Sequence, residues 1–567
     1  MKATFIIVVL LVAIAGAFAA QDPTTAIKID QIGYPVEATK FAVVTAPAAI
    51  FRVRSTSDDT VAFEGKLAPA VNDSNTGDTV RLADFTPLKR PGSYYLEVPD
   101  VGRSWRFNVG TDVYSHTLYL ATRAFYGQRC GTTVDLSPEF PLYKHPACHL
   151  RSEFHSSSGK TGAHTTHYGW HDAGDYGRYM PSSAIATATL LWTWELFGER
   201  VRSLRLDIPE SGNGIPDLLN EARWNLEWML SMQDKDGGAW HKETSEHFAG
   251  FVMPQEDTSE SVVIGTGKPP YKSTCATADL AAVAAIAARV YSSIDPQLSA
   301  RNLRAAREAW NWAARHPNVT FSNPPGVTTG EYGDSRCSDE ILWASAELWR
   351  TTGEAPYANY FIGHYAPFIE ALDSPAAENW ADVANMALWT YALAERPNGD
   401  ATAINAIKTK AVQAASTIVT RTQASAYHVS MTAKDYVWGS NGVAANYGMQ
   451  LLIANRLSPH PEFPAAALDN LHYLLGRNAF SLCWVTQVGT NAFRHPHHRP
   501  SIADDNAEPW PGLLSGGPNA NREDQVLKSL PAAPPAKVYR DDEQSYASNE
   551  VAINWQAMLV FVLAGLK

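Results

Sequence analysis

Ala276-Thr277-Ala278-Asp279-Leu280-Ala281-Ala282-Val283-Ala284-Ala285-Ile286-Ala287-Ala288 is the stretch that decides the fold of the longer part of the chain. Ala dominates it, and Ala and Leu are the best helix formers. Its apolar residues recur three and four positions apart, which is the period of an α-helix. Residues 381–394 have a similar composition. Because the side chains are small, such helices can pack closely, and we expect a helical core.

The helical period continues from Asp112 to the end of the chain. Twelve helices are predicted, at residues 111–128, 181–199, 214–233, 275–292, 297–316, 338–352, 356–372, 380–396, 401–422, 440–457, 463–476 and 550–566. Twelve helices can pair as an inner and an outer ring of six. A solenoid of paired helices could contain the same number. No fixed-period repeat is visible that would favour the solenoid.

Three long loops without a period interrupt the helices, at residues 129–180, 234–274 and 477–549. They carry Gly, Pro, His, Asp and Trp. Loops of this length in a compact domain are usually functional, so the chemistry is expected there.

The N-terminal part of the chain has the alternating pattern of short strands. Seven strands are predicted, at residues 27–32, 40–46, 50–55, 60–67, 79–85, 92–98 and 104–109. This number suits an immunoglobulin-like sandwich, and no Cys lies in it. We therefore expect a β-sandwich over residues 21–110, which braces a helical domain over residues 111–567.

The first residues have the three-part layout of an export signal. A positive start at Lys2 precedes an apolar run from Phe5 to Ala19, which ends in small residues. A membrane anchor is the alternative, but the run is short for a stable span. We expect residues 1–20 to be a signal peptide and the mature protein to be secreted or periplasmic, without a membrane contact.

The composition excludes several classes of protein. Of the 567 residues, 45% are hydrophobic and 18% charged, so disorder and a fibrous repeat are excluded. The formal net charge of −12 argues against nucleic-acid binding, because phosphate contacts need Lys and Arg. The 17 Trp, 23 Tyr and 20 Phe residues suit a large core or the recognition of flat sugar rings. A monomer is expected.

Two carboxylates stand close together in Trp170-His171-Asp172-Ala173-Gly174-Asp175-Tyr176-Gly177-Arg178-Tyr179. Asp172 and Asp175, with Ala-Gly between them, can turn toward one point. Two acceptors that converge on a water molecule can hold it and remove a proton. Calcium ligation and capping of the turn are the alternatives that the spacing leaves open.

A third carboxylate, Glu550, lies where a polar loop meets the last predicted helix. An acid in a first helical turn is also an ordinary partner of the helix dipole. Between the two motifs lies His495-Pro496-His497-His498-Arg499, which can bind hydroxyls or a phosphate, or form a solvated turn.

Together these residues resemble glycoside hydrolase family 9, in its branch with an N-terminal immunoglobulin-like domain. The resemblance covers nearly the whole mature chain and depends on the order of its motifs. These are Gln31-Ile32-Gly33-Tyr34, residues 170–179, Glu210-Ser211-Gly212-Asn213-Gly214-Ile215-Pro216-Asp217, Gly476-Arg477-Asn478, the 497–499 loop and the Glu550 segment. The resemblance implies an (α/α)6 barrel, in agreement with the count of twelve helices.

The resemblance also implies an inverting hydrolysis. Asp175 is then the general base, Asp172 helps to hold the water, and Glu550 is the general acid. Such a pair of carboxyl groups lies about 6.5–9.5 Å apart. Sugar contacts near the cleavage point are implied for His497, Arg499 and Tyr546, and an aromatic platform for Trp438, whose alternative is core packing.

One position departs from the family pattern. Gln556-Ala557 stands where the family usually has Asn and a small residue, and we expect only a local packing change. The predicted function is an endo-β-1,4-glucanase acting on cellulose and related β-glucans. The alternatives are an exo-acting relative (a cellobiohydrolase, β-glucosidase or exo-glucosaminidase) and a glucan-binding protein without catalysis.

A zinc site is predicted beside the first motif. Its ligands are Cys130, Cys148, His149 and His171. Two thiolates and two imidazoles suit tetrahedral zinc, although the spacing is not that of a standard finger. The pattern alone leaves open a buried free pair or a Cys130–Cys148 disulfide; the resemblance implies structural zinc, with His145 in reserve. Since His171 precedes Asp172, this zinc would hold the catalytic loop.

A calcium site is implied by the same resemblance. Its ligands are Ser335, Asp339, Glu340 and Asp382. Oxygen ligands fit calcium, but acids at a helix start are favourable without a metal. The remaining cysteines, Cys275, Cys337 and Cys483, lie in apolar settings and are expected to be inert.

Overall fold

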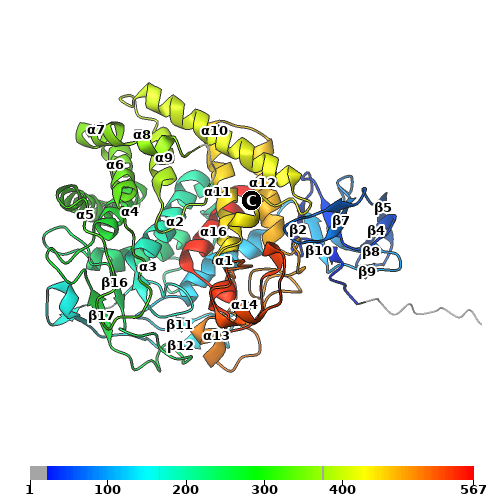
Figure 1. Cartoon of the computed structure of the whole chain (residues 1–567), viewed down its shortest axis with the longest axis horizontal. Helices are drawn as coiled ribbons and strands as arrows, with labels where there is room; N and C mark the ends of the chain where they lie inside the picture. The colour runs from blue at the N-terminus through cyan, green and yellow to red at the C-terminus, as the bar shows by residue number, and fades with distance from the viewer. Residues whose placement is uncertain (1–21, 165–166, 373–375) are drawn as a thin grey trace, which may run out of the picture.

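The computed structural model describes residues 22–164, 167–372 and 376–567 (Figure 1). The predicted signal peptide, residues 1–20, lies outside the described residues. A small β-rich lobe holds the N-terminal part, and a much larger helical body holds the rest (Figure 1). Among the helices of the described ranges, we find no candidate for a membrane-spanning segment.

The N-terminal lobe consists of two β-sheets. The first contains, in spatial order, β1 (Ile27–Lys28), β3 (Phe41–Val44), β7 (Thr79–Asp84) and β6 (Val71–Asn72). The second contains β2 (Gly33–Pro35), β10 (Phe107–Gly110), β8 (Gly92–Val98), β4 (Ile50–Ser55) and β5 (Val61–Lys66), with β9 (Gly102–Arg103) beside β8. Alternate residues such as Phe51, Val53 and Leu96 form a separate hydrophobic core. This agrees with the predicted immunoglobulin-like part.

One predicted strand is much shorter in the structure than the sequence indicated. Residues 27–32 were expected to be continuous, but β1 ends at Lys28 and β2 begins at Gly33. The side chain of Asp30 accepts the backbone N–H groups of Ile32 and Gly33 at 2.8 and 3.0 Å. These local bonds turn the chain, so that β1 and β2 join different sheets.

Each of the twelve predicted helical stretches contains a helix. The observed helices are α1 (Ser115–Gly127), α2 (Met180–Val201), α3 (Asp217–Ser231), α4 (Thr274–Val290), α5 (Pro296–Arg315), α6 (Ser338–Thr352), α7 (Ala355–His364), α8 (Ala366–Ile369), α9 (Ala384–Ala392), α10 (Ala401–Ala424), α11 (Ser440–Leu457), α12 (Glu462–Leu474) and α16 (Ile553–Leu566). The stretch 356–372 contains two of them, α7 and α8.

The most apolar helices are buried at the centre of the body. Helix α4 packs against α2, α5 and α6, and α16 packs against α2 and α11. Both α4 and α16 are buried along nearly their whole length, as their small and aliphatic side chains predict. By contrast, α5 and α10 bury only one face, so they cover the inner helices.

The predicted loops contain a β-sheet that the sequence pattern did not indicate. Its order is β14 (Ala163–His164), β13 (Ser152–Phe154), β17 (Ser261–Ile264), β16 (Lys242–Thr244) and β15 (Arg178–Tyr179). Two further strands, β11 (Val134–Asp135) and β12 (Lys144–His145), form a pair of their own. Strands of two to four residues are too short to show an alternating pattern. The sheet joins the first and second long loops.

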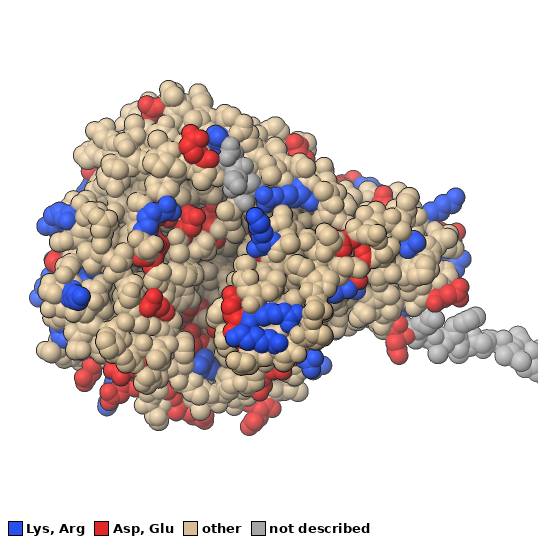
Figure 2. All heavy atoms as spheres, in the orientation of Figure 1, with Lys and Arg blue, Asp and Glu red and all other residues tan. Residues whose placement is uncertain are grey.

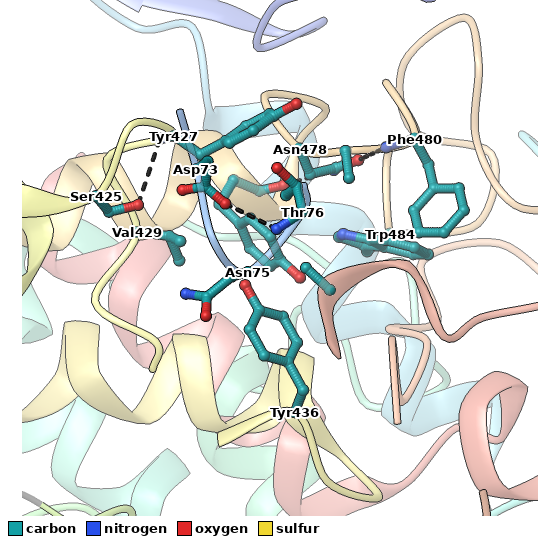
Figure 3. A pocket seen from close by; sticks show the side chains of 13 residues that line it. Asp73, Asn75, Thr76, Ser425, Tyr427, Val429, Tyr436, Asn478, Phe480 and Trp484 are labelled. Atoms are coloured by element: carbon teal, nitrogen blue, oxygen red, sulfur yellow. Dashed lines mark hydrogen bonds between the residues drawn. The ribbon is translucent and has the colours of Figure 1, made fainter. Parts of the chain in front are cut away.

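The two lobes meet through a buried polar interface. Asp30 Oδ2 lies 2.7 Å from His472 Nδ1, and Asp78 accepts hydrogen bonds from Tyr427 and Lys537 at 2.7 and 2.6 Å. Figure 3 shows a cavity here, lined by residues of both lobes such as Asp73 and Tyr436. Its volume of about 10 Å³ leaves room for no more than one water molecule. The lobes are therefore closely fitted.

The cysteines correct one prediction. Cys275 and Cys337 are joined in a disulfide, so they are not inert free thiols. The bond links the first turn of α4 to the residue before α6. Cys130, Cys148 and Cys483 are buried free cysteines, which excludes the Cys130–Cys148 disulfide that the sequence left open.

Candidate active site

A cleft of about 680 Å³ runs over the helical body. Figure 2 shows this hollow, with acidic groups along it. Asp172, Asp175 and Glu550 all line the cleft. Carboxylates from two distant parts of the sequence therefore reach one cavity.

Asp172 and Asp175 lie on a tight turn that leads into β15. The N–H of Asp172 donates to the carbonyl of Gly177 at 2.9 Å, which closes the turn. A Cβ atom on Gly174 would lie 2.0 Å from the carbonyl oxygen of His497. Only glycine fits this position, so the 497–499 loop can press against the turn. Arg499 fixes the contact by donating to the Gly174 carbonyl at 2.8 Å.

Glu550 lies between two helices and not inside one. It follows α15 (Tyr546–Asn549) in an extended conformation, and the last helix begins only at Ile553. The sequence placed Glu550 at the start of a helix over residues 550–566, which is wrong by three residues. Its carbonyl accepts the N–H of Gly516 at 2.7 Å, and its backbone pairs with that of His497. Glu550 therefore lies outside the first turn of the last helix, and it lines the cleft.

The three carboxylates have different electrostatic surroundings. Burial raises the pKa of Glu550 well above its usual range, and the charges of Asp175 and Asp172 raise it further. Burial raises the pKa of Asp172 to about 7, with a second contribution from Asp175. Asp175 Oδ2 accepts hydrogen bonds from Tyr179 Oη at 2.8 Å and from the N–H of Gly177 at 3.1 Å. Such bonds favour an ionised carboxylate.

The predicted sugar-contact residues lie together. The rings of Trp438 and Tyr546 are 5.3 Å apart, and both are more than one-third exposed. The His497 ring is 6.1 Å from that of Tyr546, and its Nδ1 lies 2.6 Å from the carbonyl oxygen of Glu543. Trp438 lines the cleft, so core packing is excluded for it. Exposed aromatic faces beside acids suit the apolar face of a sugar ring.

Arg499 joins a second aromatic segment to this wall. Its Nε donates to the carbonyl of Ala249 at 2.9 Å, and its guanidinium lies 5.6 and 5.8 Å from the ring centres of Phe248 and Phe251. Phe248 lines the cleft and is about half exposed. The sequence did not single out these two phenylalanines.

Two tyrosines that the sequence reasoning missed hold the aspartates. Tyr332 Oη donates to Asp172 Oδ2, and Tyr179 Oη donates to Asp175 Oδ2. The two rings lie 4.7 Å apart. Tyr179 belongs to the quoted motif, and its spacing of four from Asp175 was a usable signal. Tyr332 is 160 residues from Asp172 and had no local signal.

The four predicted zinc ligands form one cluster. Their ligand atoms all lie within 4.8 Å of one another. Cys148 Sγ is 3.7 Å from His171 Nε2, and a hydrogen bond from the Cys148 thiol lowers the pKa of Cys130 well below its usual range. Thiolate character of this kind is what a zinc ligand needs. The donor set therefore fits a metal ion.

A carboxylate outside the cluster orients one of its histidines. His149 Nε2 lies 3.2 Å from Asp257 Oδ2. Metal-binding histidines commonly have such a partner. The reserve ligand His145 is buried but stands outside the group of four, with Nδ1 2.7 Å from the carbonyl of Pro146.

The predicted calcium ligands are only partly brought together. Asp339 and Glu340 are buried at the start of α6, whereas Ser335 is exposed and Asp382 partly exposed. Near the start of α6, Asp279, Asp334, Asp339 and Glu340 each have a buried carboxylate oxygen without a hydrogen bond in the described chain. Burial raises the pKa of Asp339 to about 6 and that of Glu340 well above its usual range. Asp279 and Asp334, which the sequence did not suggest, complete an acidic group that a cation would neutralise.

Comparison with known families gives two matches. Residues 114–563 match the model of glycosyl hydrolase family 9. Residues 22–103 match the cellulase N-terminal ig-like domain. Together the matches cover both lobes and include the three carboxylates of the cleft.

Individual relatives are similar over nearly the full chain. Endoglucanase D of Acetivibrio thermocellus is 35% identical over 95% of this chain and 83% of its own. A xyloglucan-specific endo-beta-1,4-glucanase of Bacteroides ovatus is 33% identical over 96% of this chain and 94% of its own. A crystal structure of a Zn-binding triple mutant of a family 9 endoglucanase is 35% identical, with a TM-score of 0.87, over 94% of this chain and 99% of the other.

Proposed function

The chain belongs to glycosyl hydrolase family 9, and from this premise we propose that it is a secreted, inverting endo-β-1,4-glucanase. Its substrates are cellulose and related β-glucans. Asp175 acts as the general base and Glu550 as the general acid, while Asp172 holds the attacking water. His497, Arg499, Tyr546 and Trp438 bind the sugar chain.

The mechanism follows from the surroundings of the acids. Because burial and two nearby carboxylates raise the pKa of Glu550, it keeps the proton that the departing glycosidic oxygen needs. Asp175, which accepts hydrogen bonds from Tyr179 and from the N–H of Gly177, removes a proton from water. Water attacks the anomeric carbon as the C–O bond breaks on the opposite side, which inverts the configuration.

The observation that carries this proposal is the meeting of three carboxylates in one aromatic-lined cleft. A glucan-binding protein without catalysis would not need a buried acid with a raised pKa opposite a hydrogen-bonded carboxylate. The raised pKa of Glu550 agrees with its assignment as the acid.

Glu550→Gln tests the acid. The amide cannot protonate the leaving oxygen, so hydrolysis of a cello-oligosaccharide is expected to fall at least about a hundredfold. Binding, measured by calorimetry, is expected to stay within a few fold. Glu523→Gln, outside the cleft lining, is the control. Wild-type rates in Glu550→Gln would remove Glu550 from its role.

Product analysis tests the bond cleaved and the stereochemistry. In heavy-oxygen water the label is expected on the new reducing end, and the first product is expected to be the α-anomer. Loss of viscosity ahead of reducing sugar distinguishes endo from exo action. Xyloglucan belongs in the substrate panel, since a relative is specific for it.

We propose that Cys130, Cys148, His149 and His171 hold a structural zinc ion. Bound zinc supplies cross-links and does not take part in the reaction. The site connects the turn of Asp172 to the segment that carries Phe248. His171 directly precedes Asp172, and Asp257, which follows Phe248 in the same loop, contacts His149.

Removal of the metal tests the zinc proposal. Chelation is expected to release about one zinc per chain and to lower the melting temperature. Asp257→Asn is expected to weaken zinc binding by about tenfold in a competition assay with a chromogenic chelator. Asp236→Asn, away from the cluster, is the control. An unchanged melting temperature after verified zinc loss would overturn a structural role.

We propose a calcium site formed by Asp339 and Glu340, with Asp382 and Ser335 at its rim. The buried, unpaired oxygens of Asp279 and Asp334 support a cation here. Calcium is expected to raise the melting temperature of the wild type and not that of Glu340→Gln. An equal rise in both would contradict this site.

We propose an (α/α)6 barrel for residues 111–567, after a sandwich over residues 21–110. Support comes from the packing order of the helices: α16 contacts α2, α2 contacts α4, α4 contacts α6, and α6 contacts α9. Helix α11 lies on the other side of α16. Export rests on the apolar run of residues 1–20. We also propose a monomer, which ultracentrifugation would test.

A further inference from the structure

A buried lysine lies behind the tyrosine that holds Asp175. Lys242 stands on β16 and pairs directly with Tyr179 on β15. Its side chain is fully buried, and its Nζ is 5.6 Å from the centre of the Tyr179 ring. Tyr179 Oη in turn donates to Asp175 at 2.8 Å. A cation, an aromatic ring and a carboxylate therefore follow one another.

The hydrogen bonds of Lys242 fit its protonated form. Nζ lies 2.7 Å from Asn323 Oδ1, 2.8 Å from the carbonyl of Gly330, and 3.2 Å from that of Thr329. These three oxygens only accept, and an ammonium has three protons to donate, whereas a neutral amine has two. The Thr329 hydroxyl lies 3.0 Å away as a fourth neighbour. Lys242 thus also fixes the backbone just before Tyr332.

The charge of Lys242 has no ion pair in the described chain to neutralise it. Burial lowers the pKa of Lys242 to about 7, and the negative charges of Asp175 and Glu331 act in the opposite direction. At the acidic pH values where a general base begins to lose activity, the lysine is therefore charged. Burial holds the pKa of the adjacent His241 at about 3, so that ring is neutral.

Asp175 is surrounded by acidic, neutral and positively charged side chains. The ionisable groups packed around it are Asp172, Glu550, His497, Tyr179, Tyr332, Arg499 and Lys242. Two of these are acids that disfavour a second negative charge, and burial lowers the pKa of His497, which favours its neutral form. Lys242 is the cation on the Tyr179 side of Asp175, and Arg499 is the cation on the Gly174 side.

We propose that Lys242 is a positioning residue. Its positive charge, which lies behind the Tyr179 ring, favours the negative charge of Asp175. Its hydrogen bonds hold the segment that carries Tyr332. This rests on the proposed role of Asp175 as general base. Lys242 does not touch substrate, so its effect must appear in the pH dependence.

The test is the pH profile of kcat/KM on a soluble cello-oligosaccharide. Lys242→Met is expected to move the acidic limb upward by about one pH unit, which is the size of effect that a nearby charge produces. On that limb kcat/KM then falls about tenfold. Asn323→Asp places a carboxylate at the ammonium without a change of volume, and the same direction of shift is expected.

Lys272→Met is the matched control. Lys272 is also buried and lies 5.4 Å from the ring of Trp240, but it pairs with Asp234 at 2.7 Å and Asp236 at 3.3 Å. Its loss is expected to lower stability and to leave the acidic limb in place. If Lys242→Met does not fold, the pH profile of Asn323→Asp is the test. An acidic limb at the same pH as in the wild type, in the variants that fold, would overturn the inference.

Asp175→Asn separates this inference from the proposed function. If Asp175→Asn abolishes hydrolysis and Lys242→Met leaves the limb unmoved, only the role of Lys242 is wrong. If Asp175→Asn hydrolyses like the wild type, the assignment of the base is wrong as well.

Discussion

Asp172 and Asp175 are three residues apart and yet have different surroundings. Asp175 accepts hydrogen bonds from the phenol of Tyr179 and from a backbone N–H on the same oxygen, Oδ2. Asp172 accepts the phenol of Tyr332 on Oδ2, while its buried Oδ1 has no hydrogen bond within the described chain. A buried carboxylate oxygen beside the base is suited to hold a water molecule. The two acids can therefore divide the tasks of holding and deprotonating water.

Tyr332→Phe is the sharpest test at this scale. The variant removes the donor to Asp172 and keeps the ring that packs on Tyr179. A hydrogen bond to a charged group contributes about 1.5–3 kcal/mol, so kcat is expected to fall about tenfold or more. KM is expected to change little, because the lost bond orients water and not sugar.

Tyr360→Phe provides the comparison. Tyr360 packs on Trp310 at the surface of the helical body, away from the cleft. Its variant is expected to match the wild type in kcat and in melting temperature. A normal kcat in Tyr332→Phe would show that Asp172 needs no such support.

Prediction from the sequence depended on how local each signal is. Asp172 and Asp175 stand in one motif, and Glu550 was identified through resemblance to a family. Tyr332 contacts Asp172 across 160 residues of sequence, and Lys242 reaches the site because its strand pairs with that of Tyr179. A single sequence holds no signal for such long-range contacts.

At the scale of elements, length decided what could be predicted. Helices such as α2 and α10 span many turns, so their period and their bounds were clear. Strands β15 and β16 have two and three residues, and no alternation can appear in so short a run. The sheet that carries Tyr179 and Lys242 was therefore read as loop.

The disulfide between Cys275 and Cys337 joins two elements of the inner core. It closes a segment with a sequence separation of 62, for which chain entropy gives about 4 kcal/mol of stabilisation. The double variant Cys275→Ala/Cys337→Ala is expected to melt at a clearly lower temperature. Because Tyr332 precedes Cys337 by five residues, kcat is also expected to fall.

Reductant gives the control for this prediction. It is expected to lower the melting temperature of the wild type toward that of the double variant and to leave the variant unchanged. Equal melting temperatures of the two oxidised proteins would contradict a stabilising disulfide. Cys483 lies buried elsewhere and is present in both.

At the scale of the whole molecule, the first two strands of the N-terminal lobe contact the body. Lys28 Nζ donates to the carbonyl of Ala479 at 2.8 Å, and Tyr114 Oη donates to the carbonyl of Gly33 at 2.8 Å. Ala479 belongs to the segment of residues 478–493, which leads to His497. The small lobe therefore supports one wall of the cleft from a distance.

Gln31 is the centre of this interface and gives the last prediction. Its Oε1 accepts the N–H groups of Thr490 and Asn491 at 2.9 and 2.7 Å, and its Nε2 donates to the carbonyls of Ser481 and Asn491 at 3.0 and 3.1 Å. Gln31→Ala leaves these buried groups unpaired, which costs about 3 kcal/mol of unfolding free energy. Denaturant unfolding would measure it, with exposed Gln413→Ala as control. Since Gln31 is outside the cleft, kcat/KM at 25 °C is expected to stay within about twofold. Full stability in Gln31→Ala would mean that the lobes do not depend on each other.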